Sequence, residues 1–293
     1  MTVLFMTEQE LQQQRSFNWR IAGQPLQTIE DARVFVDAVG VCLMYPDRSL
    51  PLLPTFIGAF TGSAAGLPDA KHSFADPRAQ QATELVVRLL REKSTFEANL
   101  AGDVTLLVAS ALFPFVYALL SDRTPKAPPT TKAQGVTVSP LAARVFTALQ
   151  EHGPLSKSQL QQRVGRETSL TALDRTLGEL WSFLKITRVD YNASDGALWD
   201  VLYRWAPGPV KEGIQISEPE AISALLSKYL EAVVAVEQEE IEQFFSRVTS
   251  RAKIREAINA LLQARELSFV TVGSRTLIRM TPPPEQQRRR QHG

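Results

Sequence analysis

The chain has 293 residues, and its charge is nearly balanced, with 32 Lys and Arg against 31 Asp and Glu. Because the formal net charge is only +1, no large net field attracts the whole molecule to nucleic acid or anionic lipid, and any such binding must come from local basic patches. The apolar fraction of 44% is typical of a folded protein, and the single cysteine excludes an intramolecular disulfide, so we expect a folded protein of a reducing, cytoplasmic compartment.

The first region, residues 1–123, is expected to be mostly helical and to form a degenerate winged helix. Capping residues and apolar periodicity predict helices over 28–40, 55–60 and 76–93, a buried run over 41–45, an edge strand over 95–100 and a last helix over 106–120. The apolar run over 104–120 contains Ser110 and Pro114 and is shorter than the roughly 20 residues that a bilayer span needs. We therefore expect this run to be a buried helix and expect no membrane association.

A polar, proline-rich segment over 124–137 predicts a linker. Beyond it, serines precede three apolar patterns that are typical of helices, over 140–151, 157–164 and 169–184. Two apolar segments, 186–191 and 198–203, flank the turn 192–196 and predict a β-hairpin. Three helices followed by a hairpin form a winged helix, which we assign to residues 138–208.

The same order of elements recurs over 209–281. Helices are expected over 217–234, 237–245 and 250–264, and hairpin strands over 269–272 and 276–280. The sequence therefore predicts an α+β, mostly α protein of tandem winged helices, each a helix-turn-helix with a β-hairpin, followed by a disordered tail over 282–293.

The passage 155–207 carries Trp181 on its third helix and Trp199 in its hairpin, and it ends in Tyr203-Arg204-Trp205-Ala206-Pro207. In this layout it resembles the winged-helix proteins related to the AlkZ/YcaQ-like DNA glycosylases, the crosslink-repair superfamily. The resemblance implies several winged helices in series around a concave DNA-binding channel, and double-stranded DNA as the partner.

Active glycosylases of this kind carry Gln-x-Gln or Gln-x-Asp followed by proline, just after an early helix that ends in glycine. The matching stretch here is Gly40 to Pro46, so the resemblance places Leu43 and Tyr45 at the two polar positions. Base excision requires a polar group that positions water beside a developing sugar cation; Leu43 cannot do so, and a phenol is a poor general base at neutral pH. The motif is absent, and we expect no catalytic residue.

The start of the third helix reads the major groove in helix-turn-helix proteins, and basic residues nearby contact phosphates. The candidate DNA-contact residues of the middle unit are Lys157, Arg163, Arg166, Ser169, Thr171 and Arg175. Ser169 is explained equally well as a helix N-cap, and the cations as a solvated face. Arg188 in the hairpin is a candidate for a minor-groove wing, although Asp190 and Asp195 would repel phosphates.

The corresponding candidates in the last unit are Arg247, Ser250, Arg251, Lys253 and Arg255. Here too a solvated basic face is the competing interpretation. Each unit is close to neutral overall, so the placement of arginines must supply any phosphate contacts.

The sequence contains no motif that is typical of a metal or cofactor site. The histidines are scattered, no Gly-rich phosphate loop is present, and we expect neither a metal nor a cofactor. Cys42 lies in an apolar run and is expected to be a buried thiol, and Trp181, Trp199 and Trp205 are expected in the core.

These observations favour a non-catalytic DNA-binding protein of tandem winged helices, linked to DNA repair or transcription regulation. A DNA glycosylase that excises alkylated or crosslinked bases is the enzyme alternative, and it needs another polar group near Tyr45, such as Asp37 or Asp47. A third alternative uses the winged helices as protein-interaction modules, which the near-neutral charge permits.

Overall fold

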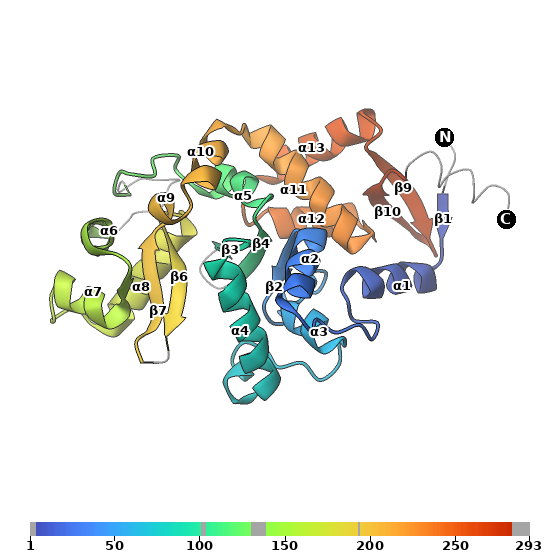
Figure 1. Cartoon of the computed structure of the whole chain (residues 1–293). Helices are drawn as coiled ribbons and strands as arrows, with labels where there is room; N and C mark the ends of the chain where they lie inside the picture. Colours follow the sequence, from blue (N-terminus) through green and yellow to red (C-terminus); the bar gives the residue numbers. More distant parts are fainter. Residues whose placement is uncertain (1–3, 101–103, 130–138, 193, 283–293) are drawn as a thin grey trace.

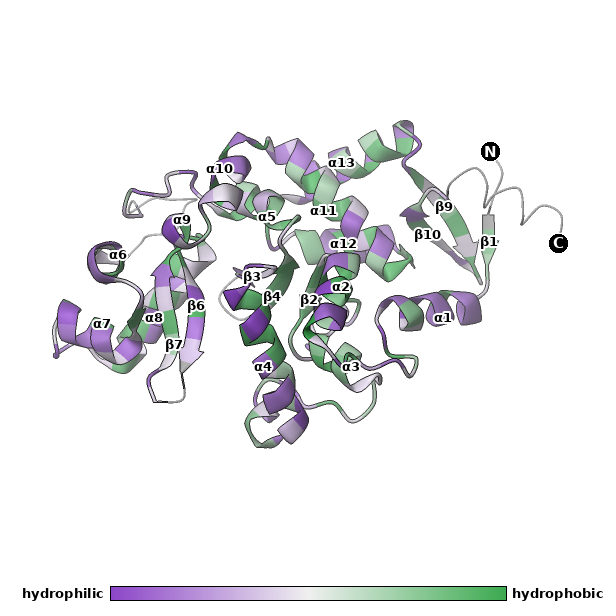
Figure 2. Cartoon of the chain, in the orientation of Figure 1, coloured by the Kyte–Doolittle hydropathy of each residue, from purple (hydrophilic) through white to green (hydrophobic). Residues whose placement is uncertain are grey.

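The computed structural model describes residues 4–100, 104–129, 139–192 and 194–282, and within them helices alternate with small sheets. Hydrophobic residues gather on β2 and β4 in the middle of the molecule, whereas α7 and β6 are largely hydrophilic (Figures 1 and 2). The α+β class expected from the sequence is confirmed.

The first part of the chain is built around an antiparallel sheet of order β2-β4-β3. Its elements are β1 (Leu4–Met6), α1 (Glu8–Asn18), α2 (Ile29–Val39), β2 (Val41–Leu43), α3 (Phe56–Thr61), the 3₁₀ turn η1 (Ser73–Ala75), α4 (Pro77–Arg91), β3 (Thr95–Leu100), β4 (Val104–Ala109) and α5 (Phe113–Leu120). Thr28 and Asp76 cap α2 and α4 as expected, and Gly40, at φ +72°, ends α2. β3 is an edge strand, as predicted.

The prediction of one helix over 106–120 is wrong. Residues 104–109 form β4, and a helix begins only at Phe113, with Pro114 in its first turn. β4 lies between β2 and β3, so its side chains are buried on both faces and give a continuous apolar run without alternation. Such a run does not distinguish a central strand from a buried helix.

The middle part of the chain contains α6 (Pro140–His152), β5 (Leu155–Ser156), α7 (Lys157–Val164), α8 (Leu170–Ser182), β6 (Ile186–Asn192) and β7 (Gly196–Val201). Ser139, Ser156 and Ser169 accept N-cap hydrogen bonds, which confirms the three helix starts. The strands form a sheet of order β5-β7-β6 over a core of its own that includes Phe146 and Leu177. The second strand ends at Val201 instead of 203, because the chain turns into a helix there.

The last part of the chain contains α9 (Leu202–Trp205), α10 (Pro207–Gln215), α11 (Glu218–Val233), β8 (Ala235–Val236), α12 (Gln238–Phe245), α13 (Arg251–Gln263), β9 (Leu267–Val272) and β10 (Arg275–Met280). The predicted helices and hairpin are confirmed, whereas α9 and α10 were not expected. The hairpin belongs to a sheet of order β1-β9-β10-β8, in which β1 pairs in parallel with β9.

One hydrophobic core joins the first and last parts of the chain. It includes Phe35, Phe56 and Phe113 from the first part and Leu226 and Ile254 from the last. Cys42 is fully buried in it, and burial raises the pKa of its thiol, as expected of a core cysteine. Trp181 and Trp199 are buried in the middle core and Trp205 packs against the larger one, as predicted.

The predicted linker is held at its start by a buried lysine. The ammonium group of Lys185 forms an ion pair with Asp122 at 2.8 Å and donates hydrogen bonds to the carbonyl oxygens of Thr124 and Ala127. The rest of the linker, 130–138, lies outside the described residues, as does the predicted disordered tail beyond 282. Among the helices that are described, none is long and apolar enough to cross a membrane.

Candidate functional site

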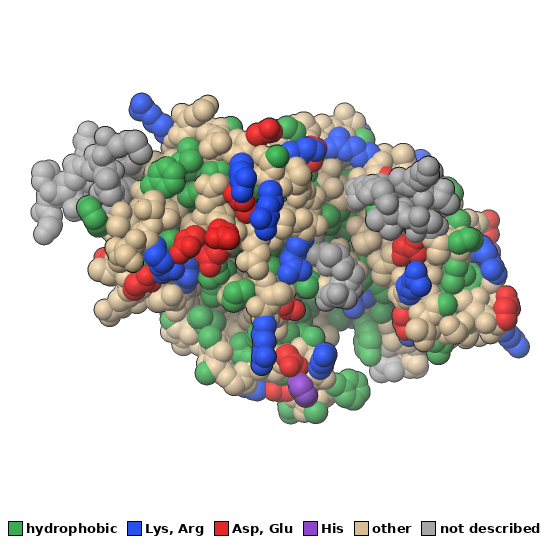
Figure 3. Space-filling view, turned by 180° about the vertical axis from the view of Figure 1, so that it is seen from behind, with side chains coloured by type: hydrophobic (Ala, Val, Ile, Leu, Met, Phe, Trp, Pro, Cys, Tyr) green, Lys and Arg blue, Asp and Glu red, His purple; other side chains and the backbone are tan. Residues whose placement is uncertain are grey.

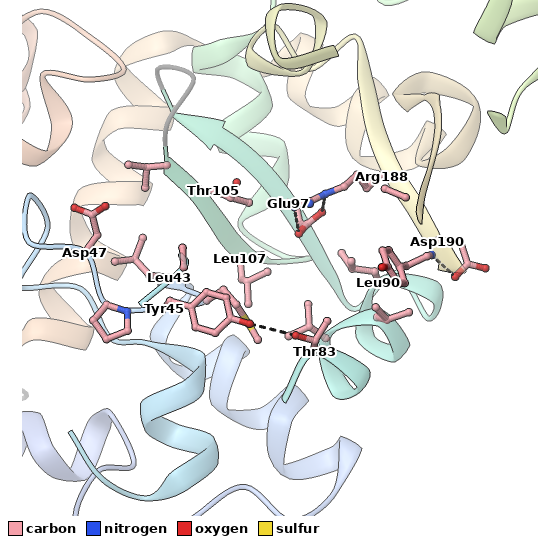
Figure 4. A pocket seen from close by; sticks show the side chains of 18 residues that line it. Leu43, Tyr45, Asp47, Thr83, Leu90, Glu97, Thr105, Leu107, Arg188 and Asp190 are labelled. Atoms are coloured by element: carbon pink, nitrogen blue, oxygen red, sulfur yellow. Dashed lines mark hydrogen bonds and ion pairs between the residues drawn. The ribbon is translucent and has the colours of Figure 1, made fainter. Parts of the chain in front are cut away.

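A pocket of about 420 Å³ lies where the first part of the chain meets the β6–β7 hairpin. Its walls come from the segment 43–47 after β2, one face of α4, strands β3 and β4, and the inner face of the hairpin (Figure 4). From behind, the surface is hollowed between the part that carries α4 and the part that carries the hairpin (Figure 3). The stretch that the family resemblance singled out, Gly40 to Pro46, therefore leads directly into this pocket.

An ion pair joins the hairpin to the sheet at one wall of the pocket. Arg188 of β6 donates from Nε and Nη2 to the two carboxylate oxygens of Glu97 on β3, at 2.8 and 2.6 Å. The Glu97 side chain is only 8% exposed, and the Arg188 guanidinium also lies over the Trp181 ring at 4.5 Å from its centroid. The stacking and the bidentate geometry fix Arg188 in the wall.

A second ion pair lies further out on the same hairpin. Arg91, the last residue of α4, contacts Asp190 at 2.6 Å. Tyr191 follows, lines the pocket and is 53% exposed. The hairpin is thus attached to α4 and to β3, and an aromatic ring remains accessible at the pocket edge.

The opposite wall is formed by the segment after β2. Leu43 is buried, whereas the Tyr45 hydroxyl lies 3.3 Å from the Thr83 hydroxyl (Figure 4). Because Thr83 donates its proton to the Ala79 carbonyl at 2.7 Å, the bond to Tyr45 must be donated by Tyr45. The Tyr45 oxygen therefore offers a ligand only lone pairs.

Asp47 is the carboxylate nearest in sequence to this wall. It accepts hydrogen bonds from the Ser49 hydroxyl and backbone NH at 2.6 and 2.7 Å, which together hold its pKa below the usual range, and Arg247 lowers that pKa further. Asp47 is therefore ionised at neutral pH. Asp37, the other carboxylate considered from the sequence, lies on α2 outside the pocket lining, and partial burial raises its pKa.

The charges in the pocket lining are unequal. Asp47, Glu97 and Asp190 contribute carboxylates, of which Glu97 is paired with Arg188 and Asp190 with Arg91, so the Asp47 carboxylate has no ion pair with an arginine among the described residues. Apart from Thr83 and Thr105, the remaining lining is apolar or aromatic, with Tyr45 on the segment after β2 and Tyr191 on β6. A flat aromatic group that carries positive charge fits this combination of stacking surfaces and acidic groups. Within the described residues, no cluster of three or more His, Cys, Asp or Glu side chains is suited to a metal ion.

Several of the predicted DNA-contact residues are bound to other groups. Lys157 pairs with Asp174, Lys253 with Glu218 and Arg255 with Glu242, at 2.7 to 2.9 Å. Arg247 donates to the Ser49 hydroxyl at 3.0 Å, and Arg188 lies in the pocket wall instead of at an exposed wing tip.

The other predicted contact residues have side chains exposed to solvent. Arg163, Arg166, Arg175, Arg251 and Thr171 form no side-chain hydrogen bond or ion pair within the described part of the chain. Ser169 and Ser250 accept N-cap hydrogen bonds of α8 and α13. These two helices lie in different parts of the molecule, so their basic residues are not brought together (Figure 1).

Glu97, Thr83 and Arg91 line or support the pocket, and none of them was singled out from the sequence. Glu97 reads as an ordinary polar position in an edge strand, and Thr83 as a polar position on an amphipathic helix. The roles of Glu97 and Arg91 depend on the hairpin, which is more than 90 residues away in the sequence, and that of Thr83 on Tyr45. A buried glutamate in a strand would point to a functional or paired residue, but the burial of Glu97 is known only from the structure.

Comparisons with known proteins indicate a family and a shared fold. A family described as DNA glycosylase AlkZ-like matches residues 67–292. Among solved structures, the Streptomyces sahachiroi DNA glycosylase AlkZ aligns with a TM-score of 0.60 at 17% identity, covering 99% of this chain and 73% of that one. At this identity the structural likeness shows a shared fold. No curated protein matches the sequence.

Proposed function

The chain belongs to the AlkZ-like DNA glycosylase family, and from this premise we propose that it binds duplex DNA at the mouth of the pocket and receives one extruded base inside it. The observation that supports this proposal most directly is the pocket, which has a volume of about 420 Å³ and lies between α4 and the β6–β7 hairpin. Proteins that act on or inspect a base take it out of the stack into a fitted pocket, where aromatic and apolar side chains stack on it. Tyr45 and Tyr191 are the stacking residues in this proposal.

The architecture assigned to this function is a series of winged helices. The order of three helices and a hairpin over 138–208 and again over 209–281 supports it, with residues 1–123 as a degenerate first unit. Arg163, Arg166 and Arg175 on one side and Arg251 on the other are the candidates for phosphate contacts, because their guanidinium groups have no protein partner among the described residues.

The substrate class we propose is DNA that carries a cationic, alkylated purine. Alkylation at a ring nitrogen gives the base a positive charge. Glu97 is paired with Arg188 and Asp190 with Arg91, so Asp47 is the carboxylate of the lining that attracts this charge. An undamaged base is neutral and gains less from Asp47. The electrostatic contrast therefore favours damaged over undamaged DNA.

Recognition without excision is the leading form of the proposal. Leu43 is buried and apolar, and the hydroxyl proton of Tyr45 is used on Thr83, so neither can hold and deprotonate a water molecule.

The test is a fluorescence anisotropy titration of two duplexes that differ only in one N7-methylguanine. A 2′-fluoro sugar at that position keeps the modified base from being lost during the measurement. We expect a preference of about tenfold or more for the modified duplex, corresponding to about 1.4 kcal/mol, and overall affinity that falls as salt rises. Absence of binding at low salt, or equal binding of the two duplexes, contradicts the proposal.

Base excision is a second candidate, favoured by the position of Asp47 in the pocket lining. An ionised carboxylate stabilises a developing sugar cation and accepts a hydrogen bond from the attacking water. The C1′–N bond breaks with its electron pair moving to the base, which becomes neutral, while the water oxygen bonds to C1′ and its proton passes to solvent. A cationic base needs no general acid to leave.

Release of labelled N7-methylguanine from an ordinary duplex tests excision separately. The candidate predicts release by the unaltered protein and its loss in Asp47→Asn, with Asp37→Asn as the control outside the pocket lining. No release by the unaltered protein removes excision and leaves the binding proposal in place.

A further inference from the structure

The apolar ring of Phe74 is exposed to solvent and belongs to none of the hydrophobic cores of the described residues. Its exposed fraction is 90%, the highest among the exposed large hydrophobic side chains, ahead of Phe5 at 73% and Phe17 at 69%. It lies in η1, the turn that leads into α4. Single exposed apolar residues are common on proteins, so Phe74 becomes informative only through its surroundings.

The segment that carries Phe74 is fixed by hydrogen bonds. The Asp69 carboxylate accepts from the backbone NH groups of Lys71 and His72, at 3.0 and 2.9 Å. Gln80 donates to the Phe74 carbonyl at 3.3 Å, and Arg78 donates to the Gly66 carbonyl at 2.9 Å. The ring is therefore held out by an ordered turn, which lowers the entropy cost of inserting it into a partner.

The same segment forms part of the pocket mouth. Ala70 lines the pocket, and α4, which begins directly after η1, contributes Thr83 and Val87 to it. The lower end of α4 with its preceding turn projects from the molecule beside the β6–β7 hairpin (Figure 1). A duplex that places an extruded base in the pocket therefore passes close to Phe74.

One cation near Phe74, Lys71, is available to a polyanion. The carboxylates of Asp69 and Asp76 are engaged by His72 and Arg78, at 2.7 and 2.6 Å. Lys71, exposed, makes no side-chain ion pair within the described part of the chain, and Arg78 is 47% exposed. At this end of the molecule basic and acidic side chains are interspersed, next to hydrophobic ones (Figure 3).

From these observations we infer that Phe74 inserts into the base stack of duplex DNA next to the extruded nucleotide. Extrusion leaves a gap in the stack, and an apolar side chain that fills the gap recovers stacking and blocks return of the base. Lys71, whose ammonium group has no ion pair among the described residues, contacts a phosphate beside the inserted ring. This inference rests on the proposed function, because it assumes that duplex DNA lies at the pocket mouth.

The experiment uses 2-aminopurine placed beside the modified guanine, since its fluorescence rises when the neighbouring base leaves the stack, and a phenylalanine ring in place of that base does not quench it. We expect the unaltered protein to raise the fluorescence on binding, because the inserted ring blocks return of the base. Phe74→Ala should abolish the rise and weaken binding by about tenfold, and Phe74→Trp should retain the affinity, because stacking of a base on an aromatic side chain supplies about 1 to 3 kcal/mol. Phe17→Ala is the matched control, because Phe17 is an exposed phenylalanine on α1, away from the pocket. Since Phe74 is exposed, its replacement leaves the melting temperature unchanged.

The outcomes separate this inference from the proposed function. If the protein binds and prefers the modified duplex while Phe74→Ala matches Phe17→Ala in affinity and fluorescence, insertion is wrong and base binding stands. If the unaltered protein binds neither duplex, the proposed function itself fails. A Phe74→Ala protein that weakens binding with an unchanged fluorescence rise overturns insertion, because the ring then contacts DNA without entering the stack.

Discussion

The ion pair between Arg188 and Glu97 should be among the costliest interactions in this protein to break from one side. Arg188→Met leaves the Glu97 carboxylate, 8% exposed, without its partner. Removing one member of a buried pair costs roughly 3–5 kcal/mol, and we expect the low end, about 3 kcal/mol, because Arg188 is itself 34% exposed. Glu97→Gln should cost less, about 1 to 2 kcal/mol, since the guanidinium keeps solvent and its contact with Trp181.

The double variant decides whether these costs belong to the pair. With both charges removed, no unpaired charge stays buried, so Arg188→Met with Glu97→Gln should lose about 1 to 2 kcal/mol, and the coupling energy should reach at least about 2 kcal/mol. Urea unfolding at neutral pH, followed by tryptophan fluorescence, measures all four proteins. Losses that add to within about 0.5 kcal/mol would show that the two side chains do not depend on each other, and would refute the assignment of this pair as the fixed wall of the pocket.

Three further outcomes follow from the buried and paired groups. Lys185→Met leaves Asp122 unpaired and should lower the free energy of unfolding by about 3 kcal/mol while opening the start of the linker to trypsin. The pKa of Glu242 is lowered to about 2, chiefly by its hydrogen bonds with Arg255. The ionised carboxylate therefore stabilises the folded protein above its unfolded pKa of about 4.3, and this stabilisation is lost as the pH falls toward 2. The destabilisation caused by Glu242→Gln should accordingly shrink between pH 5 and 2. Cys42 should resist a thiol reagent in the native protein and react after unfolding, because burial raises its pKa.

Matched variants control the first two measurements. Lys211→Met removes an exposed lysine of α10, and Glu239→Gln removes an exposed glutamate from the first turn of α12. Trypsin resistance of Lys185→Met, or a loss of stability in Glu242→Gln that stays constant down to pH 2, contradicts the roles assigned to these two residues. Rapid labelling of Cys42 in the native protein contradicts its place in the core.

The helices could be predicted where the signal was local. Ser139, Ser156 and Ser169 each accept a hydrogen bond from the third backbone NH of the following helix, so a single residue and its neighbours suffice to place the start. The first helix, α1, was not predicted because it is polar and only its Leu11 and Arg15 are buried. β4 was mistaken for a helix because burial on both faces erases the alternation that identifies a strand.

The pocket could be predicted only in part. The segment Gly40 to Pro46 was singled out by its resemblance to a family motif, and the structure places Tyr45 and Asp47 of that neighbourhood in the lining. The Glu97 contact with Arg188 depends on two chain segments that meet in space, and no spacing in the sequence encodes that meeting. The basic helix starts, in contrast, were visible in the sequence, but whether a cation is free or paired depends on acids from other helices, such as Glu218.

The most direct test of the central claim compares lesion preference with the pocket open and filled. Thr83 is exposed on α4 and lines the pocket, so Thr83→Trp adds bulk inside it without disturbing the core. We expect this variant to bind undamaged duplex as the unaltered protein does and to lose its preference for the N7-methylguanine duplex, so that the ratio of the two affinities falls to about one. A Thr83→Trp protein that keeps the full preference would show that the modified base is recognised outside this pocket.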